Sequence, residues 1–348
     1  MPEDLRNRVD RQPTVAGLSE ADLLARIFPR LRMNDAHTSS TLLGPGDDAA
    51  VVAAPDGKTI ISIDTQVQDQ DFRLEWPNGY RTTGFDVGWK AAAQNLSDIN
   101  AMGATATSLV VSLTLPPGTP VSWVEDLADG LTAGIRELGA GRCSVAGGDL
   151  GRGREISVTV AVLGTLDGGH AVLRSGAKPG DVLALAGTAG HAAAGLALLE
   201  STVNVNALGE TERAFLDLQC RPRPPLDAGP AARAAGATAM LDISDGLLRD
   251  GLRLATASSM AIDLDPAQVQ VLGEVLRPAS ALLGTDPAAW VLNGGEDHGL
   301  LATFPADVQL PPGFAAIGSV QALGSNESPS VKIAGRPADA GGWDHFAH

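Results

Sequence analysis

The residues with the clearest chemical potential in this chain are acidic side chains that stand beside glycines. Two single aspartates, Asp64 and Asp98, accompany four such motifs, which are Gly46-Asp47-Asp48, Gly147-Gly148-Asp149, Asp242-Ile243-Ser244-Asp245-Gly246 and Gly294-Gly295-Glu296-Asp297. Carboxylate oxygens are the ligands that Mg²⁺ prefers, and an adjacent glycine lets the backbone approach a bulky anion. We assign no histidine or cysteine to this set. Together the motifs indicate Mg²⁺-assisted phosphoryl transfer.

Each motif also has a simpler structural interpretation. Asp beside Gly is common in turns, and Ser244 is suited to capping the helix that follows it. Asp98 is compatible with a solvated helix face. However, Asn95 and Asp98 share one face of the expected helix, while Leu96 and Ile99 lie on another. That division gives one polar stripe and one packing stripe.

Basic residues near the acidic motifs are few. Arg174 is the best candidate for a phosphate contact, because a guanidinium group binds anions through several hydrogen bonds. We interpret Lys90, Arg152 and Lys178 as ordinary surface charges. The chain contains neither a Gly-x-x-x-x-Gly-Lys-Ser/Thr sequence nor a kinase-type glycine-rich loop followed by Val-Ala-Ile-Lys, so neither of these phosphate-binding devices is expected.

Length and composition narrow the classes of protein. The 348 residues predict two domains, 1–167 and 168–348, with the boundary near a turn-rich segment. A formal charge of -16 disfavours binding to nucleic acid. Two cysteines exclude a disulfide framework and a cysteine-based zinc site. No targeting signal and no apolar run long enough to span a membrane is visible, so we expect a cytoplasmic protein without membrane partners.

Hydrophobic periodicity predicts an α/β fold of mixed α+β character. Helices are expected over 19–32, 83–102, 121–138, 189–200, 211–218, 228–236 and 245–257. Strands are expected over 49–54, 59–64, 105–115, 143–147, 154–165, 181–186, 238–243, 260–264 and 299–303. Ser19 and Asp22 predict a capping box at the first helix. Residues 65–80 are expected to form a loop.

The ordered set of motifs resembles that of the thiamine-monophosphate kinase family, in the superfamily that includes aminoimidazole ribonucleotide synthetase. The matching segments are Gly46-Asp47-Asp48-Ala49-Ala50, Ser62-Ile63-Asp64-Thr65, Asn95-Leu96-Ser97-Asp98, Ala101-Met102-Gly103-Ala104, Gly147-Gly148-Asp149, Arg174-Ser175-Gly176-Ala177-Lys178-Pro179-Gly180-Asp181, Asp242-Ile243-Ser244-Asp245-Gly246-Leu247, Gly294-Gly295-Glu296-Asp297 and Gly342-Trp343-Asp344-His345-Phe346. The resemblance covers nearly the whole chain, from about residue 44 to residue 346. It implies a two-domain fold like that of aminoimidazole ribonucleotide synthetase, whose N-terminal α/β domain binds ATP and Mg²⁺ and forms a homodimer.

The resemblance also implies a reaction and a set of site residues. ATP would donate its γ-phosphoryl group directly to thiamine monophosphate, giving thiamine diphosphate and ADP without a phospho-enzyme. Carried over by motif, the ligands of several Mg²⁺ ions would be Asp48, Ser62, Asp64, Asp98, Asp149, Asp242 and Asp245. The nucleotide contacts would be Gly148, Asp149, Arg174 and Ser244, and the thiamine contacts would be Glu296 and Trp343.

Two positions depart from the family pattern. Ile63 stands where the family usually has threonine, so any metal contact there must use its carbonyl oxygen. Asp71 stands where a histidine is expected to touch the substrate. A carboxylate can pair with the thiazolium or the aminopyrimidine of thiamine, so we assign Asp71 to substrate binding, with a solvated loop residue as the alternative.

Two other functions remain open from the sequence. One is another ATP-using enzyme of the same superfamily, although selenophosphate synthetase and the hydrogenase-maturation member need cysteines that this chain lacks at the relevant ends. The other is a non-catalytic protein that binds a magnesium nucleotide, which the changes at Ile63 and Asp71 motivate.

Overall fold

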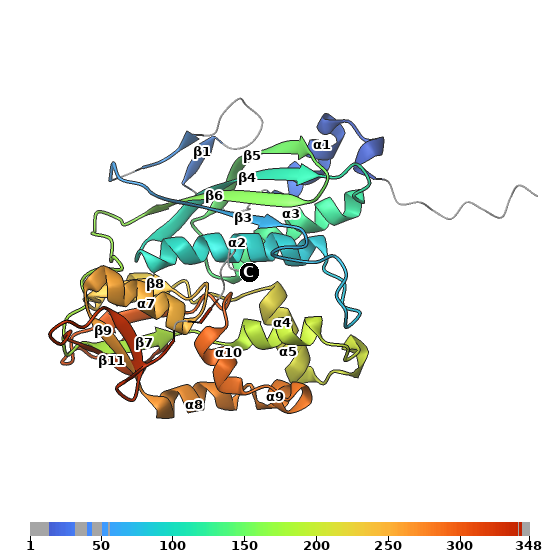
Figure 1. Ribbon diagram of the computed structural model, residues 1–348. Helices are drawn as coiled ribbons and strands as arrows, with labels where there is room; N and C mark the ends of the chain where they lie inside the picture. The colour runs from blue at the N-terminus through green and yellow to red at the C-terminus, as the bar shows by residue number, and fades with distance from the viewer. Residues whose placement is uncertain (1–13, 32–39, 44–50, 55, 340, 343–348) are drawn as a thin grey trace, which may run out of the picture.

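The computed structural model describes residues 14–31, 40–43, 51–54, 56–339 and 341–342. Its two larger sheets lie in separate halves of the molecule, one above the other in Figure 1. A short hairpin of β1 (Thr41–Leu43) and β2 (Val51–Val52) accompanies the upper half. Residues before α1 form a 3₁₀ turn, η1 (Val15–Gly17). The predicted mixed α/β fold is confirmed.

The upper half contains a four-stranded sheet with the order β3-β6-β4-β5. Its strands are β3 (Ile60–Val67), β4 (Thr105–Leu115), β5 (Ser144–Arg152) and β6 (Ser157–Thr165). β5 pairs with β4 in parallel, and the other two pairings are antiparallel. Helices α2 (Gly84–Ala101) and α3 (Val121–Glu137) pack on one face, and α1 (Glu20–Leu31) packs on α3.

The lower half contains a seven-stranded mixed sheet with the order β13-β12-β9-β11-β7-β10-β8. The strands are β7 (Val182–Ala186), β8 (Ala239–Asp242), β9 (Ala261–Leu264), β10 (Leu300–Phe304), β11 (Phe314–Gln321), β12 (Ser330–Ile333) and β13 (Arg336–Pro337). The helical elements are α4 (His191–Glu200), η2 (Val205–Ala207), α5 (Glu210–Cys220), α6 (Ala228–Ala234), α7 (Leu247–Ser258), α8 (Pro266–Glu274), α9 (Arg277–Leu283) and α10 (Pro287–Asn293). Leu183 and Leu185 of β7 belong to one hydrophobic cluster and Ala184 and Ala186 to another, so both faces of this sheet are buried.

Helix α2 lies between the two halves (Figure 1). It contacts β3, β4 and β6 above it, and β8, α5 and α6 below it. Each half has its own large hydrophobic cluster, and Ala101 of α2 belongs to a third cluster whose other buried members lie between residues 172 and 304. The boundary between residues 167 and 168 stays a prediction.

Several predicted elements differ in extent from the observed ones. The capping box is confirmed, since the Asp22 N–H donates to Ser19 Oγ over 3.2 Å and the Ser19 N–H donates to Asp22 Oδ2 over 3.3 Å. The strand expected at 143–147 continues to Arg152, so Gly148 and Asp149 lie inside a strand and not in a turn. The strand expected at 49–54 is described only from residue 51, and β2 covers Val51–Val52. Elements β11 to β13 and α8 to α10 were not predicted.

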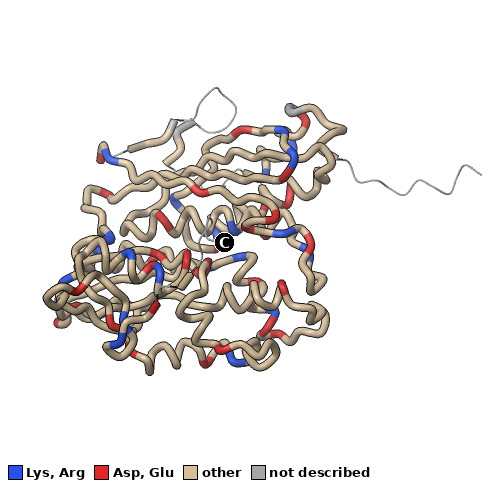
Figure 2. Tube along the Cα trace, viewed as in Figure 1, with Lys and Arg blue, Asp and Glu red and all other residues tan. Residues whose placement is uncertain are grey.

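The charges of the chain are mixed over both halves. In Figure 2, lysine and arginine residues are scattered among acidic residues along the described trace, and they do not gather into one stripe. Within the described residues, no helix combines the length and the apolar character that crossing a membrane requires.

Glycines let α2 and α3 approach closely. A Cβ atom on Gly88 would lie 2.0 Å from the Leu127 carbonyl oxygen, and one on Gly130 would lie 2.0 Å from the Phe85 carbonyl oxygen. Real Cβ atoms do not come so near to backbone oxygens, so any side chain at either position must push the helices apart. The position of α2, and of every polar side chain on it, therefore depends on these glycines.

We expect Gly88→Ala to lower the free energy of unfolding by about 2 kcal/mol or more, despite alanine's better helix propensity. Urea denaturation of the purified chain measures the effect. Gly118→Ala is the matched control, because a Cβ there meets nothing within 4 Å. Equal stability of the two variants would contradict the close-packing argument.

Candidate active site

Helix α2 carries polar side chains toward both halves of the molecule. It begins after Thr83, whose hydroxyl accepts from the Asp86 N–H over 3.2 Å, while the Asp86 carboxylate accepts from the Thr83 N–H over 2.9 Å. Lys90 and Ser97 are seven residues apart, about two turns, so they share one face. Both are buried, and both bond to residues of the lower half.

Strand β3 faces α2 with alternate residues. Ser62, Asp64 and Gln66 are less exposed than Ile61, Ile63 and Thr65, with which they alternate, so they lie on the helix side of the strand. The Ser62 hydroxyl donates to Asp98 of α2, and Gln66 Nε2 donates to Gln94 Oε1 over 2.9 Å. Three of the predicted metal ligands, Ser62, Asp64 and Asp98, thus gather between β3 and α2.

A fourth predicted ligand reaches this group from the lower half. Asp242 is the last residue of β8, and its Oδ2 accepts from Ser97 Oγ over 2.8 Å. The same oxygen lies 3.1 Å from Nδ1 of His298. Burial opposes the charge on Asp242, yet the hydrogen bond and charge of His298 lower its pKa overall. The same contacts, with burial opposing them, raise the pKa of His298.

The other carboxyl groups of the cluster interact unfavourably. Burial, followed by the charges of Asp242 and Asp64, raises the pKa of Asp98 to about 7. Burial raises the pKa of Asp64 as well, and the charge of Asp242 adds to the shift. Negative charge is therefore concentrated here beyond what the neighbouring side chains neutralise.

These residues fit a hard divalent cation. The donors are carboxylate and hydroxyl oxygens, the set that Mg²⁺ binds, and a cation would relieve the repulsion among the carboxylates. Among the described residues, no group of three or more His, Cys, Asp or Glu side chains already stands in a coordination arrangement. The residues therefore suit Mg²⁺ by their chemical type and by their proximity. A bound ion would draw these ligands together.

A second polar group lies further along the same face of α2. Lys90 Nζ lies 2.5 Å from Glu296 Oε2 and donates to the Asp71 carbonyl oxygen over 3.2 Å. Gln219 Nε2 donates to the same Glu296 oxygen over 2.6 Å. Burial opposes the charge on Glu296, but the charge and hydrogen bond of Lys90 lower its pKa. Two predicted substrate residues, Asp71 and Glu296, thus meet at one lysine.

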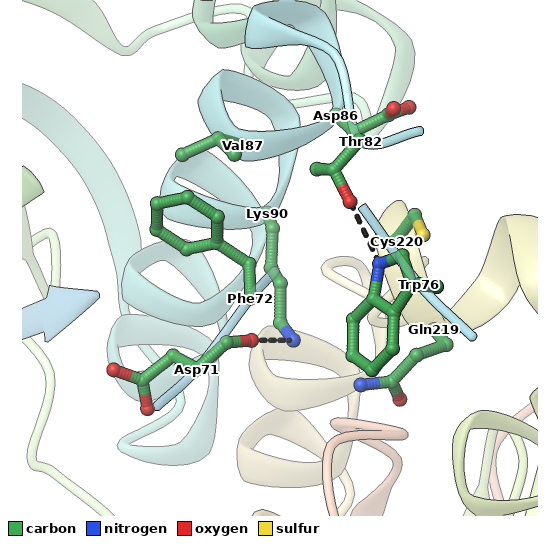
Figure 3. Close-up of a pocket in the computed structure, with 9 residues that line it drawn as sticks. All are labelled: Asp71, Phe72, Trp76, Thr82, Asp86, Val87, Lys90, Gln219 and Cys220. Carbon is green, nitrogen blue, oxygen red and sulfur yellow. Dashed lines mark hydrogen bonds between the residues drawn. The ribbon is translucent and has the colours of Figure 1, made fainter. Parts of the chain in front are cut away.

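Figure 3 shows how these groups are oriented. Lys90 extends from α2 between Phe72 and Trp76, and its ammonium group reaches the Asp71 carbonyl. The Asp71 carboxylate points away from the lysine, and its Oδ2 accepts from the Val67 N–H over 2.7 Å. The loop prediction for 65–80 is confirmed except for its first residues, since β3 continues to Val67.

The Gly-Gly-Glu-Asp motif is a turn whose successive side chains bind different elements. Asp297 accepts from Thr188 Oγ1 over 2.8 Å and from the Gly190 N–H over 2.7 Å, which ties the turn to the start of α4. Glu296 reaches α2, and His298 reaches β8. Glu296 and His298 adopt left-handed backbone angles, with φ of 65° and 52°. Such strain in non-glycine residues concentrates at functional sites.

The segment before α7 departs from its prediction. Ser244 is not the N-cap; that residue is Gly246, and the buried Asp250 carboxylate accepts from the backbone N–H groups of Ser244, Asp245 and Gly246 over 3.0, 2.9 and 3.1 Å. Asp245, a predicted metal ligand, lies 2.5 Å from the Arg253 guanidinium. As the structure stands, an arginine neutralises that carboxylate.

Arg174 is exposed, as expected for a residue that meets a nucleotide. It lines a cavity of about 580 Å³ together with Arg249 and Arg253 of α7. The charge of Arg174 also helps to lower the pKa of Asp242, so this arginine lies within electrostatic reach of the carboxylate cluster.

Gly148 and Asp149 lie apart from the cluster. In strand register, Asp149 pairs with Ser112, Ser112 with Thr159, and Thr159 with Thr65. Paired residues share a face, so Asp149 lies on the outer face of the sheet, opposite the face that carries Asp64. A Cβ on Gly148 would lie 2.2 Å from the Val111 carbonyl oxygen, which explains this glycine by packing alone. Asp48 and Trp343, also predicted site residues, lie outside the described residues.

Comparison with known proteins agrees with this geometry. Residues 46–166 match the model of the AIR synthase related protein, N-terminal domain. Thiamine-monophosphate kinase from Mycobacterium tuberculosis H37Rv is 45% identical over 308 residues, covering 88% of this chain and 86% of the relative. The chain belongs to the thiamine-monophosphate kinase family.

Two solved structures of the family share its fold. The thiamine-monophosphate kinase from Stenotrophomonas maltophilia K279a has a TM-score of 0.74 and 30% identity, covering 92% of this chain and 98% of that one. AaThiL complexed with AMPPCP and TMP has a TM-score of 0.72 and 28% identity, covering 94% of this chain and 97% of that one. The resemblance drawn from the motifs is therefore confirmed.

Four residues that hold site residues of this thiamine-monophosphate kinase family member in place were not predicted from its sequence. Lys90 is 3% exposed, so its interpretation as a surface charge was wrong. Its spacing of seven from Ser97 on one helix was the available signal. His298 directly follows the Gly-Gly-Glu-Asp motif, yet no histidine was assigned to the set. Gln219 and Asp250 gave no signal, because their partners are remote or are backbone groups.

For this family member we expect Asp250→Ala to lower the free energy of unfolding by about 2–4 kcal/mol, because three backbone N–H groups lose their acceptor. Chemical denaturation measures the loss. Asp265→Ala is the control: Asp265 is an exposed N-cap that accepts from one N–H, so about 1 kcal/mol is expected. An Asp250 variant no less stable than the control would contradict this role.

Proposed function

We propose that this chain transfers the γ-phosphoryl group of ATP to thiamine monophosphate. An oxygen of the acceptor phosphate forms a bond to the γ-phosphorus while the bond from that phosphorus to the β,γ-bridging oxygen breaks. The products are thiamine diphosphate and ADP. The acceptor oxygen is ionised at neutral pH, so the reaction needs no strong general base, and no covalent enzyme intermediate is involved.

One observation carries the proposal. The carboxylate cluster of Asp64, Asp98 and Asp242 and the pair of Lys90 and Glu296 lie along one helix, where the two halves meet. Phosphoryl transfer requires charge neutralisation beside a positioned acceptor, and these two groups are suited to those two tasks. The names of the relatives, and the AaThiL complex with AMPPCP and TMP, support the same reaction.

Magnesium is part of the proposal. Asp64, Asp98 and Asp242, with the Ser62 hydroxyl, are the residues of the cluster that would hold it, and Asp48, Asp149 and Asp245 are the further predicted ligands. When bound, Mg²⁺ would neutralise negative charge on the phosphates of ATP. The cluster's raised carboxyl pKa values support a cation here, since a nearby positive charge favours the ionised forms.

The remaining predicted residues divide between donor and acceptor. We assign Arg174, Gly148, Asp149 and Ser244 to the nucleotide. We assign Glu296, Asp71 and Trp343 to thiamine monophosphate, with the anionic Glu296 suited to the cationic acceptor. For Asp71, the hydrogen bond from the Val67 N–H keeps the carboxylate turned from Lys90, so its contact with thiamine would come from another side.

A panel of phosphoryl acceptors tests the function. The purified chain is incubated with ATP, Mg²⁺ and either thiamine monophosphate, thiamine or AMP, and both ADP and the phosphorylated acceptor are measured. We expect turnover with thiamine monophosphate alone, and its loss in EDTA with recovery on added Mg²⁺. Nucleotide binding without any turnover would favour the non-catalytic alternative.

In the same assay Asp98→Asn should lower kcat by at least about 100-fold, because a predicted cation ligand loses its charge. Folding should be unaffected: the raised pKa of Asp98 means that its ionised form is already disfavoured in the folded chain. Asp126→Asn, at an exposed aspartate of α3, is the control and should keep wild-type turnover. Full activity of the Asp98 variant at limiting Mg²⁺ would remove this residue from the site.

We also propose that the chain is a homodimer through the outer face of the four-stranded sheet. Ile61 and Ile63 of β3 are 69% and 64% exposed, and Val110 of β4 is 42% exposed. Ile63 and Val110 both pair with Ala161 of β6, so the three side chains lie on one face. An exposed apolar patch of this kind calls for cover by another protein surface.

The strand order supports the same proposal. Asp64 is on β3 and Asp149 on β5, the two edges of the sheet, about 14 Å apart at the usual spacing between strands. They also face opposite sides, so one protomer cannot bring this pair of predicted ligands to one cation. A second copy against the outer face would supply a partner surface on the side where Asp149 lies.

Light scattering at micromolar concentration should report a dimer for the wild-type chain and a monomer for the double variant Ile61→Lys, Ile63→Lys. Two charges on the apolar face would be buried without partners, which is strongly unfavourable. Val271→Lys, at a side chain of α8 that is 60% exposed, is the control and should remain dimeric. A monomeric wild-type chain would refute the dimer.

A further inference from the structure

Lys90 is the one basic residue of α2, and its contacts go beyond those of a surface charge. Its ammonium group bonds both to the Asp71 carbonyl oxygen, 3.2 Å away, and to Glu296 Oε2, 2.5 Å away. We propose that Lys90 is a positioning residue for the acceptor substrate, which acts by fixing the Glu296 carboxylate and the Asp71 loop relative to each other. The inference rests on the proposed function, since it concerns how that acceptor is held.

Lys90 itself is placed where a substrate cannot touch it. Only 4% of its side chain is exposed. The void beside it, lined by Phe72, Trp76 and Gln219 among others, has a volume of about 10 Å³, room for about one water molecule (Figure 3). The lysine must therefore act through the groups that it binds.

The contacts of Glu296 allow Lys90 to act on the acceptor through it. Lys90 and Gln219 both bind Oε2, and among the described residues no hydrogen bond to Oε1 is found. The side chain keeps 35% of its surface exposed. One carboxylate oxygen is thus anchored from the protein interior, while the other is left for a ligand, in an orientation that the two donors determine.

The loop that follows β3 and contains Asp71 is bound by the same ammonium group. Its backbone carbonyl accepts from Lys90, and its carboxylate accepts from the Val67 N–H at the end of β3. The loop is therefore tied to α2 on one side and to the sheet on the other. Loss of Lys90 would remove the bond between the Asp71 carbonyl and α2, together with the positive charge and one of the two donors beside Glu296.

The first test is Lys90→Met, which keeps the length of the side chain and removes the ammonium group. We expect KM for thiamine monophosphate to rise about 10-fold and KM for ATP to change less than about twofold, because only the acceptor side loses its support. The dissociation constant for thiamine monophosphate without ATP, from calorimetry, should rise by the same factor. Changes of equal size for both substrates, or no change in either, would overturn the inference.

A double-mutant cycle separates positioning from general stability. If Lys90 acts in part through Glu296, then Lys90→Met should raise the acceptor dissociation constant by much less than 10-fold in a Glu296→Gln background, where only the bond to the Asp71 carbonyl is lost. A further 10-fold loss in that background would overturn the inference. The double variant leaves neither an unpaired buried carboxylate nor an unpaired buried ammonium group, so its dissociation constant for thiamine monophosphate remains measurable even if a single variant does not fold, and wild-type affinity in it would overturn the inference.

Lys332 provides the matched control. Its Nζ lies 2.5 Å from Glu327, as Lys90 lies from Glu296, and it is on β12, among residues that we assign no role in catalysis. Lys332→Met should leave both KM values unchanged; an equal rise in acceptor KM would overturn the inference. Because the dissociation constant is measured without ATP, absent phosphoryl transfer would refute the proposed function alone, whereas unchanged acceptor binding in Lys90→Met would refute the inference alone.

Discussion

The burial of polar side chains along α2 is the constraint on which the arrangement of both halves depends. Lys90 and Ser97 are almost fully buried, and their partners Glu296 and Asp242 belong to the other half of the molecule. A buried ammonium group without its carboxylate would be strongly unfavourable, so the two halves cannot separate or slide at this contact without exposing or stranding charges. The ion pair therefore specifies a geometry more than it adds stability.

The turn around Glu296 completes this arrangement because three consecutive side chains bind three different elements. Glu296 bonds to α2, Asp297 to the start of α4, and His298 to the end of β8. Such divergence within three residues requires unusual backbone angles, and the positive φ values of Glu296 and His298 supply them. Gly295 is needed beside them, since a Cβ there would lie 2.3 Å from the Ser244 carbonyl oxygen. The Gly-Gly-Glu-Asp motif thus connects three elements of the fold and also contributes a candidate site residue, Glu296.

The sequence predicts a feature well when the residues that determine it are close together in the chain, and poorly when they are far apart. Helix α2 was predicted nearly to the residue, because its polar and packing stripes are read within one segment. The length of β5 was not predicted, since the adjacent Gly147 and Gly148 suggest a turn. Only the Val111 carbonyl oxygen of the neighbouring strand explains Gly148. Lys90 was misread because its charge suggests the surface, while its partner lies 206 residues further along the chain. Helices α8 and α10 were missed although each begins with a local capping signal, an N-cap aspartate followed by proline at Asp265 and Asp286.

The gathering of carboxylates also shows why an acidic chain can serve a polyphosphate. The net charge of -16 opposes the approach of ATP, and the cluster of Asp64, Asp98 and Asp242 concentrates that repulsion in one place. The same concentration favours cations there over other parts of the surface. His298 and Lys90 each neutralise one carboxylate, Asp242 and Glu296 respectively, and both come from within the fold. Internal cations thus fix Asp242 and Glu296, while burial and mutual repulsion raise the pKa values of Asp64 and Asp98, whose ionised forms lack such a partner. Lys90, which we propose for acceptor positioning, and Asp98, which we propose for cation binding, lie about two turns apart on α2.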